Sequence, residues 1–132
     1  MNYLCIHTRN QDLAESFQIF FEGKYQIHIL PDREHLLEYL QSPECKCQVL
    51  IYDAEDPSGD DIRFLNQLKK SFPELKVLIC YVYFEERRFS EDLLASTVDD
   101  IVYKPFDFGE VDRRLQQLIV SSDITQQTYP LS

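Results

Sequence analysis

The sequence predicts an α/β domain in which five parallel strands form one sheet with helices on both faces. Short apolar runs rich in β-branched and aromatic residues alternate five times with segments of helical periodicity. The fourth apolar run, KVLICYVYF, is hydrophobic at nearly every position, which is typical of a central strand in a parallel sheet. Strands that alternate with helices are joined by right-handed crossovers, so all five should run in one direction.

The first half of the chain supplies three strands and two helices. Strands are expected over residues 3–7, 25–30 and 48–52. The helices between them should face the core with Leu13, Phe17, Phe20, Phe21, Leu36, Leu37 and Leu40. Gly23 stands where the first helix would end, and Asp32 is placed to cap the second.

The second half continues the alternation. The third helix should place Ile62, Leu65, Leu68 and Phe72 on one face, and strands should follow over 76–84 and 100–103. A weaker helix is expected between those strands, over 90–96. The last helix opens with Asp107 and Glu110 at capping-box spacing and runs through Leu115 and Leu118. Periodicity stops after Val120, so we expect a domain over 1–121 and a flexible tail over 122–132.

Size and charge limit the function. The 132 residues suit one domain with no room for a second. A net charge of −10, from 13 basic and 23 acidic residues, repels phosphate backbones and argues against direct nucleic-acid binding. No apolar stretch is long enough to cross a bilayer, and the first residues lack a signal-peptide layout. We therefore expect a cytoplasmic protein without a membrane partner.

The four cysteines are expected to be unpaired. Cys5 and Cys80 lie in strand-like runs, where a small apolar thiol is usually buried. Cys45 and Cys47 form a C-x-C that is either part of a metal site or a pair of ordinary loop thiols. No second pair at zinc spacing follows, which favours loop thiols. A cytoplasmic chain is also expected to form no disulfide.

Several polar residues follow the predicted strands at one end of the sheet. In an open parallel sheet, the working site lies beyond the carboxyl ends of the strands. Those ends deliver His7 with Thr8, then Asp53, then Tyr81, and finally Lys104. We expect these side chains to converge on one edge.

Two segments carry a family resemblance. They are VLIYDAEDPSGDD, where Asp53 ends a strand, and DDIVYKPFDFGEV, which contains Lys104, Pro105 and Phe106. Together, in this order and at these strand ends, they resemble the receiver domain of bacterial two-component response regulators over residues 1–120. The resemblance implies a flavodoxin-like (βα)5 fold with three α/β/α layers.

The resemblance also implies a phosphoryl-transfer site. Asp53 would be the phosphoacceptor, Lys104 would pair with the phosphoryl oxygen, and the carbonyl of Glu55 would face a Mg²⁺ ion. The family's other metal ligands are an acid pair at the end of the first strand. A Ser or Thr after the fourth strand senses the phosphoryl group and couples to an aromatic residue in the fifth. Pro105 would carry a cis peptide bond that aims the lysine.

The chain departs from that pattern at three places. His7 and Thr8 replace the acid pair, Tyr81 replaces the Ser or Thr, and Ile101 replaces the aromatic residue. An imidazole and a hydroxyl are poor Mg²⁺ ligands, and losing the metal removes much of the transition-state stabilisation. We therefore interpret the chain as a pseudo-receiver with impaired or absent aspartyl phosphorylation and no cofactor. Mg²⁺ would bind only if the site is functional.

Alternatives remain open for several of these residues. The alternative to a pseudo-receiver is a conventional single-domain regulator that is phosphorylated on Asp53. In that case acidic residues of the following loop would bind the metal, and the candidates are Glu55, Asp56, Asp60 and Asp61. Asp53 and Lys104 also suit a purely structural salt bridge, and His7 suits a hydrogen-bonded core position better than a metal or pH-sensing role. Tyr81 is a candidate gate. A flavin or nucleotide enzyme is disfavoured, because the chain has three glycines and none follows the first strand.

The expected partners are proteins: a histidine kinase, an output protein or a second copy of the chain. In receivers, the face formed by the fourth helix, fifth strand and fifth helix binds such partners. Here that face would present the residues Asp99, Asp100, Ile101, Arg113 and Arg114. Their opposite charges suit either a reciprocal homodimer contact or simple pairs within one molecule.

Overall fold

The computed structural model describes residues 2–55, 57–83 and 88–128, with side-chain surroundings for all of these except 88–90 and 121–128. The strands are β1 (Asn2–His7), β2 (Tyr25–Ile29), β3 (Val49–Asp53), β4 (Lys76–Tyr81) and β5 (Asp100–Tyr103). They form one parallel sheet in the order β2-β1-β3-β4-β5. The predicted flavodoxin-like fold, the fold of receiver domains, is confirmed.

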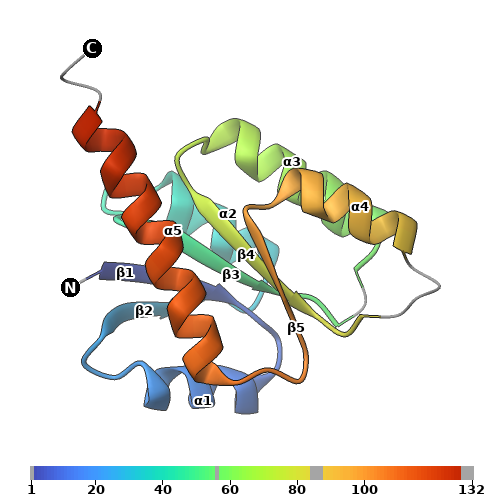
Figure 1. The fold of residues 1–132 in the computed structure, drawn as a ribbon, viewed down its shortest axis with the longest axis horizontal. Coiled ribbons are helices and arrows are strands. Elements are labelled where there is room, and N and C mark those ends of the chain that lie inside the picture. Colours follow the sequence, from blue (N-terminus) through green and yellow to red (C-terminus); the bar gives the residue numbers. More distant parts are fainter. Residues whose placement is uncertain (1, 56, 84–87, 129–132) are drawn as a thin grey trace.

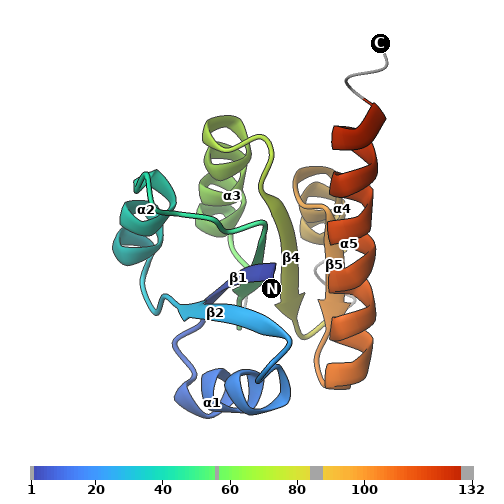
Figure 2. The ribbon, with the colours of Figure 1, turned by 90° about the vertical axis from the view of Figure 1, so that its left-hand side faces the viewer.

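In the part of the chain that the structure describes, five helices cover the two faces of the sheet (Figures 1 and 2). They are α1 (Gln11–Phe20), α2 (Arg33–Gln41), α3 (Gly59–Ser71), α4 (Arg88–Thr97) and α5 (Phe108–Thr128). Apolar residues of α1 and α5 pack on one face with Ile6, Ile51 and Leu78. Helices α2, α3 and α4 pack on the other face with Leu50 and Ile79. The alternation along the strands therefore divides their buried apolar residues between two cores.

Strand order determines where a site can form. β1 and β3 are neighbours in the middle of the sheet, but β1 connects through α1 on one face and β3 through α3 on the other. The two connections leave their strand ends in opposite directions, which opens a crevice beyond the carboxyl ends of these strands. His7 and Asp53 are the last residues of β1 and β3.

The helix ends match the sequence signals in part. Asp32 caps α2 by accepting the His35 backbone N–H at 2.8 Å, as predicted. Gly23 has a φ of 80°, which is unfavourable for residues with a side chain, and it lies in the turn after α1. Asp107 begins α5 as expected, because its side chain accepts the Gly109 N–H at 2.7 Å. The other half of the predicted capping box is not seen among the described residues, where Glu110 instead pairs with Arg114. A capping box forms instead at the start of α3.

The lengths of β4 and α5 also differ from those expected from the sequence. β4 ends at Tyr81, and Phe84 of the predicted strand lies outside the described residues. α5 continues to Thr128, beyond the point near Val120 where the periodic pattern stops. Figures 1 and 2 show this end of α5 extending past the sheet. None of the described helices is both long and apolar enough to span a bilayer.

Phenylalanines join the start of α5 to α1. Phe17 of α1 stacks on Phe106 with ring centroids 5.9 Å apart and meets Phe108 edge-on at 5.1 Å. Phe20 stacks on Phe108 from one turn further along α1, at 5.5 Å. The loop that follows β5 is therefore held against α1 by aromatic packing.

The expectation that no disulfide forms is wrong. Cys5 in β1 and Cys47 in the loop before β3 are joined as a disulfide, with Cα atoms 6.2 Å apart. Because β1 and β3 pair directly, the loop that enters β3 passes beside Cys5, which the linear sequence does not reveal. Cys45 and Cys80 remain free, and Cys80 is buried as predicted.

Leu65 on α3 is fully buried between the helix and the sheet. Leu65→Ala removes apolar contacts and leaves a cavity, so it should lower the free energy of unfolding by about 2–5 kcal/mol. Urea denaturation followed by circular dichroism measures the change. Ile19→Ala on the exposed face of α1 is the control and should change stability by less than about 0.5 kcal/mol. Equal losses in the two variants would contradict the assignment of this core.

Candidate functional site

The carboxyl ends of the strands bring together three of the predicted site residues. Asp53 of β3 lies between Thr8, which follows β1, and Lys104, which follows β5. The Asp53 side chain is only 3% exposed. Thr8 is equally buried, at 2%. The sequence therefore predicted the convergence correctly for these residues.

Both carboxylate oxygens of Asp53 are engaged by the chain itself. Oδ1 forms an ion pair with Nζ of Lys104, and Oδ2 accepts the Thr8 hydroxyl at 2.6 Å. The Thr8 oxygen in turn accepts the backbone N–H of Asn10 at 3.0 Å. A buried carboxylate needs such partners, because removing its charge from water is costly. Thr8 and Lys104 thus contact the Asp53 carboxylate from two sides.

Lys104 is aimed at Asp53 by the backbone around it. Its N–H donates to the carbonyl of Tyr81 at 2.9 Å, and the bond to Pro105 is cis, as the resemblance implied. Phe106 and Phe108 then anchor the loop on α1. The lysine side chain remains about one-fifth exposed, so the ion pair lies at the rim of the core.

His7 occupies a core position beside Asp53. Its Nδ1 lies 2.9 Å from the carbonyl oxygen of Leu30, so that nitrogen carries the proton. The ring lies against Tyr52 with centroids 4.8 Å apart. Burial lowers the pKa of His7, and the nearby Arg33 and Arg9 lower it further. The imidazole is therefore neutral near pH 7.

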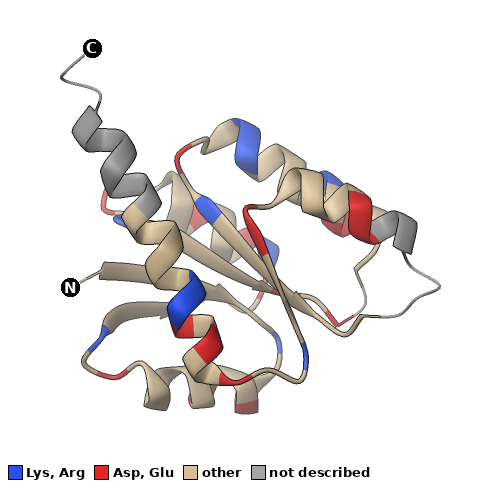
Figure 3. Ribbon diagram, viewed as in Figure 1, with Lys and Arg blue, Asp and Glu red and all other residues tan. Residues whose placement is uncertain are grey.

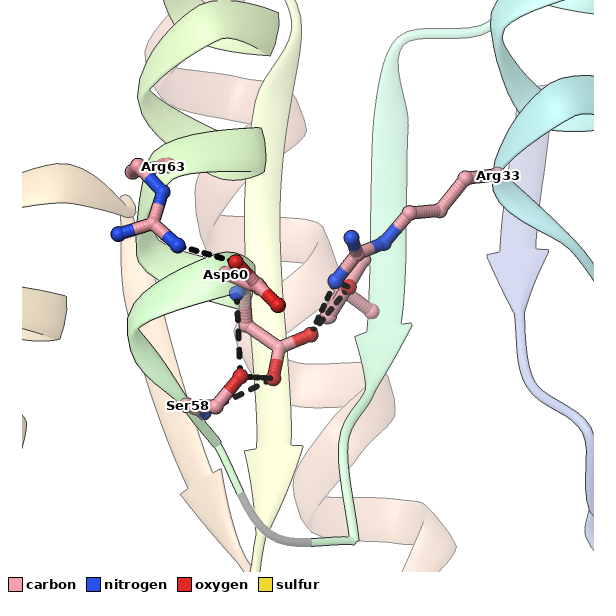
Figure 4. A network of polar contacts seen from close by, with 6 residues as sticks. Arg33, Ser58, Asp60 and Arg63 are labelled. Atoms are coloured by element: carbon pink, nitrogen blue, oxygen red, sulfur yellow. Dashed lines mark hydrogen bonds and ion pairs between the residues drawn. The ribbon is translucent and has the colours of Figure 1, made fainter.

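A pocket of about 780 Å³ opens next to His7 and Asp53, between the starts of α2 and α3. One wall is a polar network that the sequence analysis missed (Figure 4). Asp61 accepts the Tyr52 hydroxyl at 2.6 Å and Arg33 at 2.8 Å, and its other oxygen accepts the Ser58 backbone N–H at 2.9 Å. The spacing of Ser58 and Asp61 was the one visible signal, since it is that of a capping box.

The network changes the titration of its members. Desolvation opposes ionisation of Asp61, but the bonds from Tyr52, Ser58 and Arg33 outweigh it and lower the pKa of this carboxyl. Burial, followed by the bond to Asp61, raises the pKa of Tyr52 far above its usual value. Asp61 is therefore ionised near pH 7, and the ion pair with Arg33 balances its charge.

The residues at the family's metal position do not fit Mg²⁺. Asp53 already uses both oxygens, and the Thr8 hydroxyl is directed at Asp53. His7 offers a nitrogen, whereas Mg²⁺ prefers oxygen ligands in an octahedral array. The loop acids do not compensate, because Asp60 pairs with Arg63 and Asp61 with Arg33, while Glu55 is exposed and Asp56 lies outside the described residues. Among the described residues, no three His, Cys, Asp or Glu side chains are grouped to hold a metal.

Tyr81 belongs to the opposite face of the sheet. In the β3–β4 register Asp53 is paired with Cys80, so the next residue, Tyr81, points toward α4. Its buried hydroxyl has no hydrogen-bond partner among the described residues. Burial, with a smaller effect of the nearby Glu91 carboxylate, raises the pKa of Tyr81 to about 12. Ile101 packs in this second core as well.

The expected partner face uses most of its charges internally. Asp100 accepts Arg114 at 2.7 Å, and Arg114 also pairs with Glu110. Asp99 accepts Lys69 of α3 at 2.6 Å, while Arg113 is exposed. Figure 3 shows acidic residues near the start of α5, followed by basic ones in the next part of the helix. Of the pairs that the sequence suggested within one molecule, Asp100–Arg114 forms, whereas Asp99 pairs with Lys69.

Comparisons with known proteins identify the fold but no close relative. No protein-family model matches the chain, and no curated protein matches it in sequence. A response regulator receiver domain from Clostridium thermocellum is 15% identical with a TM-score of 0.78, covering 95% of this chain and 99% of that one. The Thermotoga maritima response regulator TrrA, solved with Mg²⁺ and BeF, is 20% identical with a TM-score of 0.71, over 89% and 99% of the two chains.

A longer protein has the same fold in one part. NtrX from Brucella abortus, solved in complex with ADP, is 15% identical with a TM-score of 0.81. The match covers 99% of this chain but only 29% of NtrX, so the chain spans less than a third of that protein. These likenesses show that the chain has the receiver-domain fold.

The Asp53–Lys104 pair should be strongly coupled. Asp53→Asn and Lys104→Met each leave a partly buried charge without its partner and should each cost about 3 kcal/mol of unfolding free energy. The double variant should cost less than the sum of the two, because neither charge remains. Urea denaturation of all four proteins measures the coupling, and additive losses would show that the two groups do not interact.

Asp61 should control stability in acid. Its pKa is lowered on folding, so its stabilising contribution is complete above the unfolded value near 4. That contribution is lost as the pH falls through the lower folded pKa. Asp61→Asn should therefore cost about 1.5–3 kcal/mol at pH 7 and flatten the loss of stability below about pH 4. Asp60→Asn, at the exposed neighbouring pair, should leave both the stability and its pH profile nearly unchanged.

Proposed function

We propose that the chain is a receiver-like domain of two-component signalling that acts through protein contacts, without Mg²⁺-dependent phosphorylation of Asp53. The observation that carries the proposal is the state of the Asp53 carboxylate. Thr8 and Lys104 engage its two oxygens, and its side chain is 3% exposed. A carboxylate in this state is not available as a nucleophile.

Activation of Asp53 would require several unfavourable changes. An incoming phosphoryl group must displace the Thr8 hydroxyl, and its charge would face Asp53 with Lys104 as the neighbouring cation. Phosphoryl transfer depends on neutralising charge on the transferred oxygens, which a divalent ion normally provides. The donor set around Asp53 does not suit that ion. Tyr81, which points toward α4, also supplies no small hydroxyl to sense a phosphoryl group.

The partner face would bind through apolar and aromatic contacts. Tyr83 and Tyr103 pack edge-on with ring centroids 5.5 Å apart and stay more than one-third exposed, as does Val82 beside them. Aromatic residues of this kind are enriched in protein interfaces. Because Asp99, Asp100 and Arg114 are paired internally, a reciprocal charged homodimer is less favoured than a kinase or output protein. Either partner would place the chain in the cytoplasm.

A conventional phosphorylatable regulator is the second candidate. Asp53 and Lys104 stand where the receiver family has its acceptor and lysine, and the structure of TrrA was determined with Mg²⁺ and BeF. In this alternative the Thr8 bond opens and a metal enters from the pocket beside α3. The two candidates differ in one measurable property, which is metal-coupled binding of a phosphoryl analogue.

Beryllofluoride with Mg²⁺ should produce no saturable change in tyrosine fluorescence of the purified chain, because the ligands around Asp53 do not suit Mg²⁺. Acetyl phosphate with Mg²⁺ should likewise leave the intact mass unchanged. A phosphoryl adduct that disappears in Asp53→Asn would overturn the proposal and support the conventional regulator.

A variant that is expected to gain Mg²⁺ and beryllofluoride binding shows that the assay can detect such binding when the parent protein gives no signal. His7→Asp combined with Thr8→Asp frees one Asp53 oxygen and adds two carboxylates at the family's acid-pair position. This double variant should bind Mg²⁺ and beryllofluoride together. His7→Asn with Thr8→Asn, which lacks the charges, is the matched control and should bind neither.

A further inference from the structure

We propose that Cys47 and Cys5 form a thiol–disulfide exchange site that responds to small disulfides of the glutathione class. The site lies near the amino ends of β3 and β4, at the edge of the sheet opposite Asp53. It is independent of the proposed signalling function, and either can fail without the other.

The two cysteines have the asymmetry that an exchange site requires. Cys5 is fully buried in β1, whereas Cys47 is partly exposed in the loop before β3. Their Cα atoms are 6.2 Å apart, within the range that a disulfide spans. Sγ of Cys47 also lies 3.3 Å from the carbonyl oxygen of Val49, an acceptor that a reduced Cys47 thiol can use. The fold therefore accommodates both the oxidised and the reduced pair.

A pocket gives small molecules access to the exposed partner. It has a volume of about 350 Å³ and is lined by Cys45 and Cys47, with Leu40 and Phe72 as apolar walls. Gln48 borders the same pocket, and its Oε1 has no hydrogen-bond partner among the described residues. The volume is in the lower part of the range for small-molecule sites.

The exchange proceeds in two balanced steps. The Cys47 thiol loses its proton to water, and the thiolate attacks one sulfur of the small disulfide, which releases one small thiol. The sulfur of Cys5 then attacks the Cys47 sulfur of the mixed disulfide, the Cys5 proton passes to the departing small thiolate, and the second small thiol is released. Two protein thiols are oxidised to one disulfide, and one small disulfide is reduced to two thiols.

Oxidation should stabilise the fold by tying the loop before β3 to the centre of the sheet. The two cysteines are 42 residues apart, so the link removes considerable freedom from the unfolded chain. We expect the midpoint of thermal unfolding to be about 10 °C higher for the oxidised protein than for the reduced protein. Cys47→Ser should abolish this difference.

The test combines thiol counting with mass spectrometry on the full chain. After incubation with oxidised glutathione, quenching and denaturation, alkylation should label two cysteines, Cys45 and Cys80, and reduced glutathione should restore four. Peptide mapping should identify the Cys5–Cys47 link. Four labelled cysteines under both conditions, or a Cys45–Cys47 link, would overturn the proposal.

Single variants assign the roles. Cys5→Ala removes the attacking thiol of the second step, so one glutathione should accumulate on Cys47. Cys47→Ser should take up no glutathione at Cys5 and should form no disulfide, which tests the proposal even if Cys5→Ala does not fold. Cys80→Ala is the buried control and should behave as the parent protein. A glutathione adduct on Cys45 in the Cys5→Ala variant would show that Cys47 is not the entry thiol.

Discussion

The buried carboxylate of Asp53 is the constraint around which the carboxyl edge of the sheet is organised. A charge with 3% exposure is tolerated only if its oxygens find partners, and the strand order places the residues that follow β1 and β5 within reach. Thr8 and Lys104 supply those partners from the two sides. The Asp53 side chain, at the end of β3, is consequently linked to the segments that follow β1 and β5.

A second carboxylate is neutralised in the same way a short distance along the chain. Asp61 binds Tyr52 from the sheet, Arg33 from α2 and Ser58 from the start of its own helix. Metal sites differ in principle, because they hold several carboxylates close together and leave their mutual repulsion for the ion to relieve. Asp53 and Asp61, by contrast, are both paired with groups of the protein itself. The pocket between them is polar, and its lining includes the acidic residues Asp32, Glu34 and Glu55 as well as Arg9 and Arg33.

The sequence predicted those features that depend on local patterns. Five strands and five helices follow from periodicity, and Asp53 and Lys104 follow from their positions at strand ends. The disulfide of Cys5 and the Arg33–Asp61 pair were missed, because each depends on how a loop or helix end lies beside a distant strand. The orientation of Tyr81 depends on the pairing register of β3 and β4. A one-residue difference in register would exchange the two faces, and composition does not fix it.

The phenylalanines between α1 and the loop after β5 have a consequence for how this edge can change over evolution. Lys104 is followed within four residues by Phe106 and Phe108, whose rings pack on Phe17 and Phe20, so the packing of α1 helps to set the position of the lysine. Substitutions that change the packing of α1 would therefore move the Lys104 side chain even if Thr8, Asp53 and Lys104 themselves were unchanged. Two related proteins with the same three residues could therefore differ in the strength of the Asp53–Lys104 ion pair.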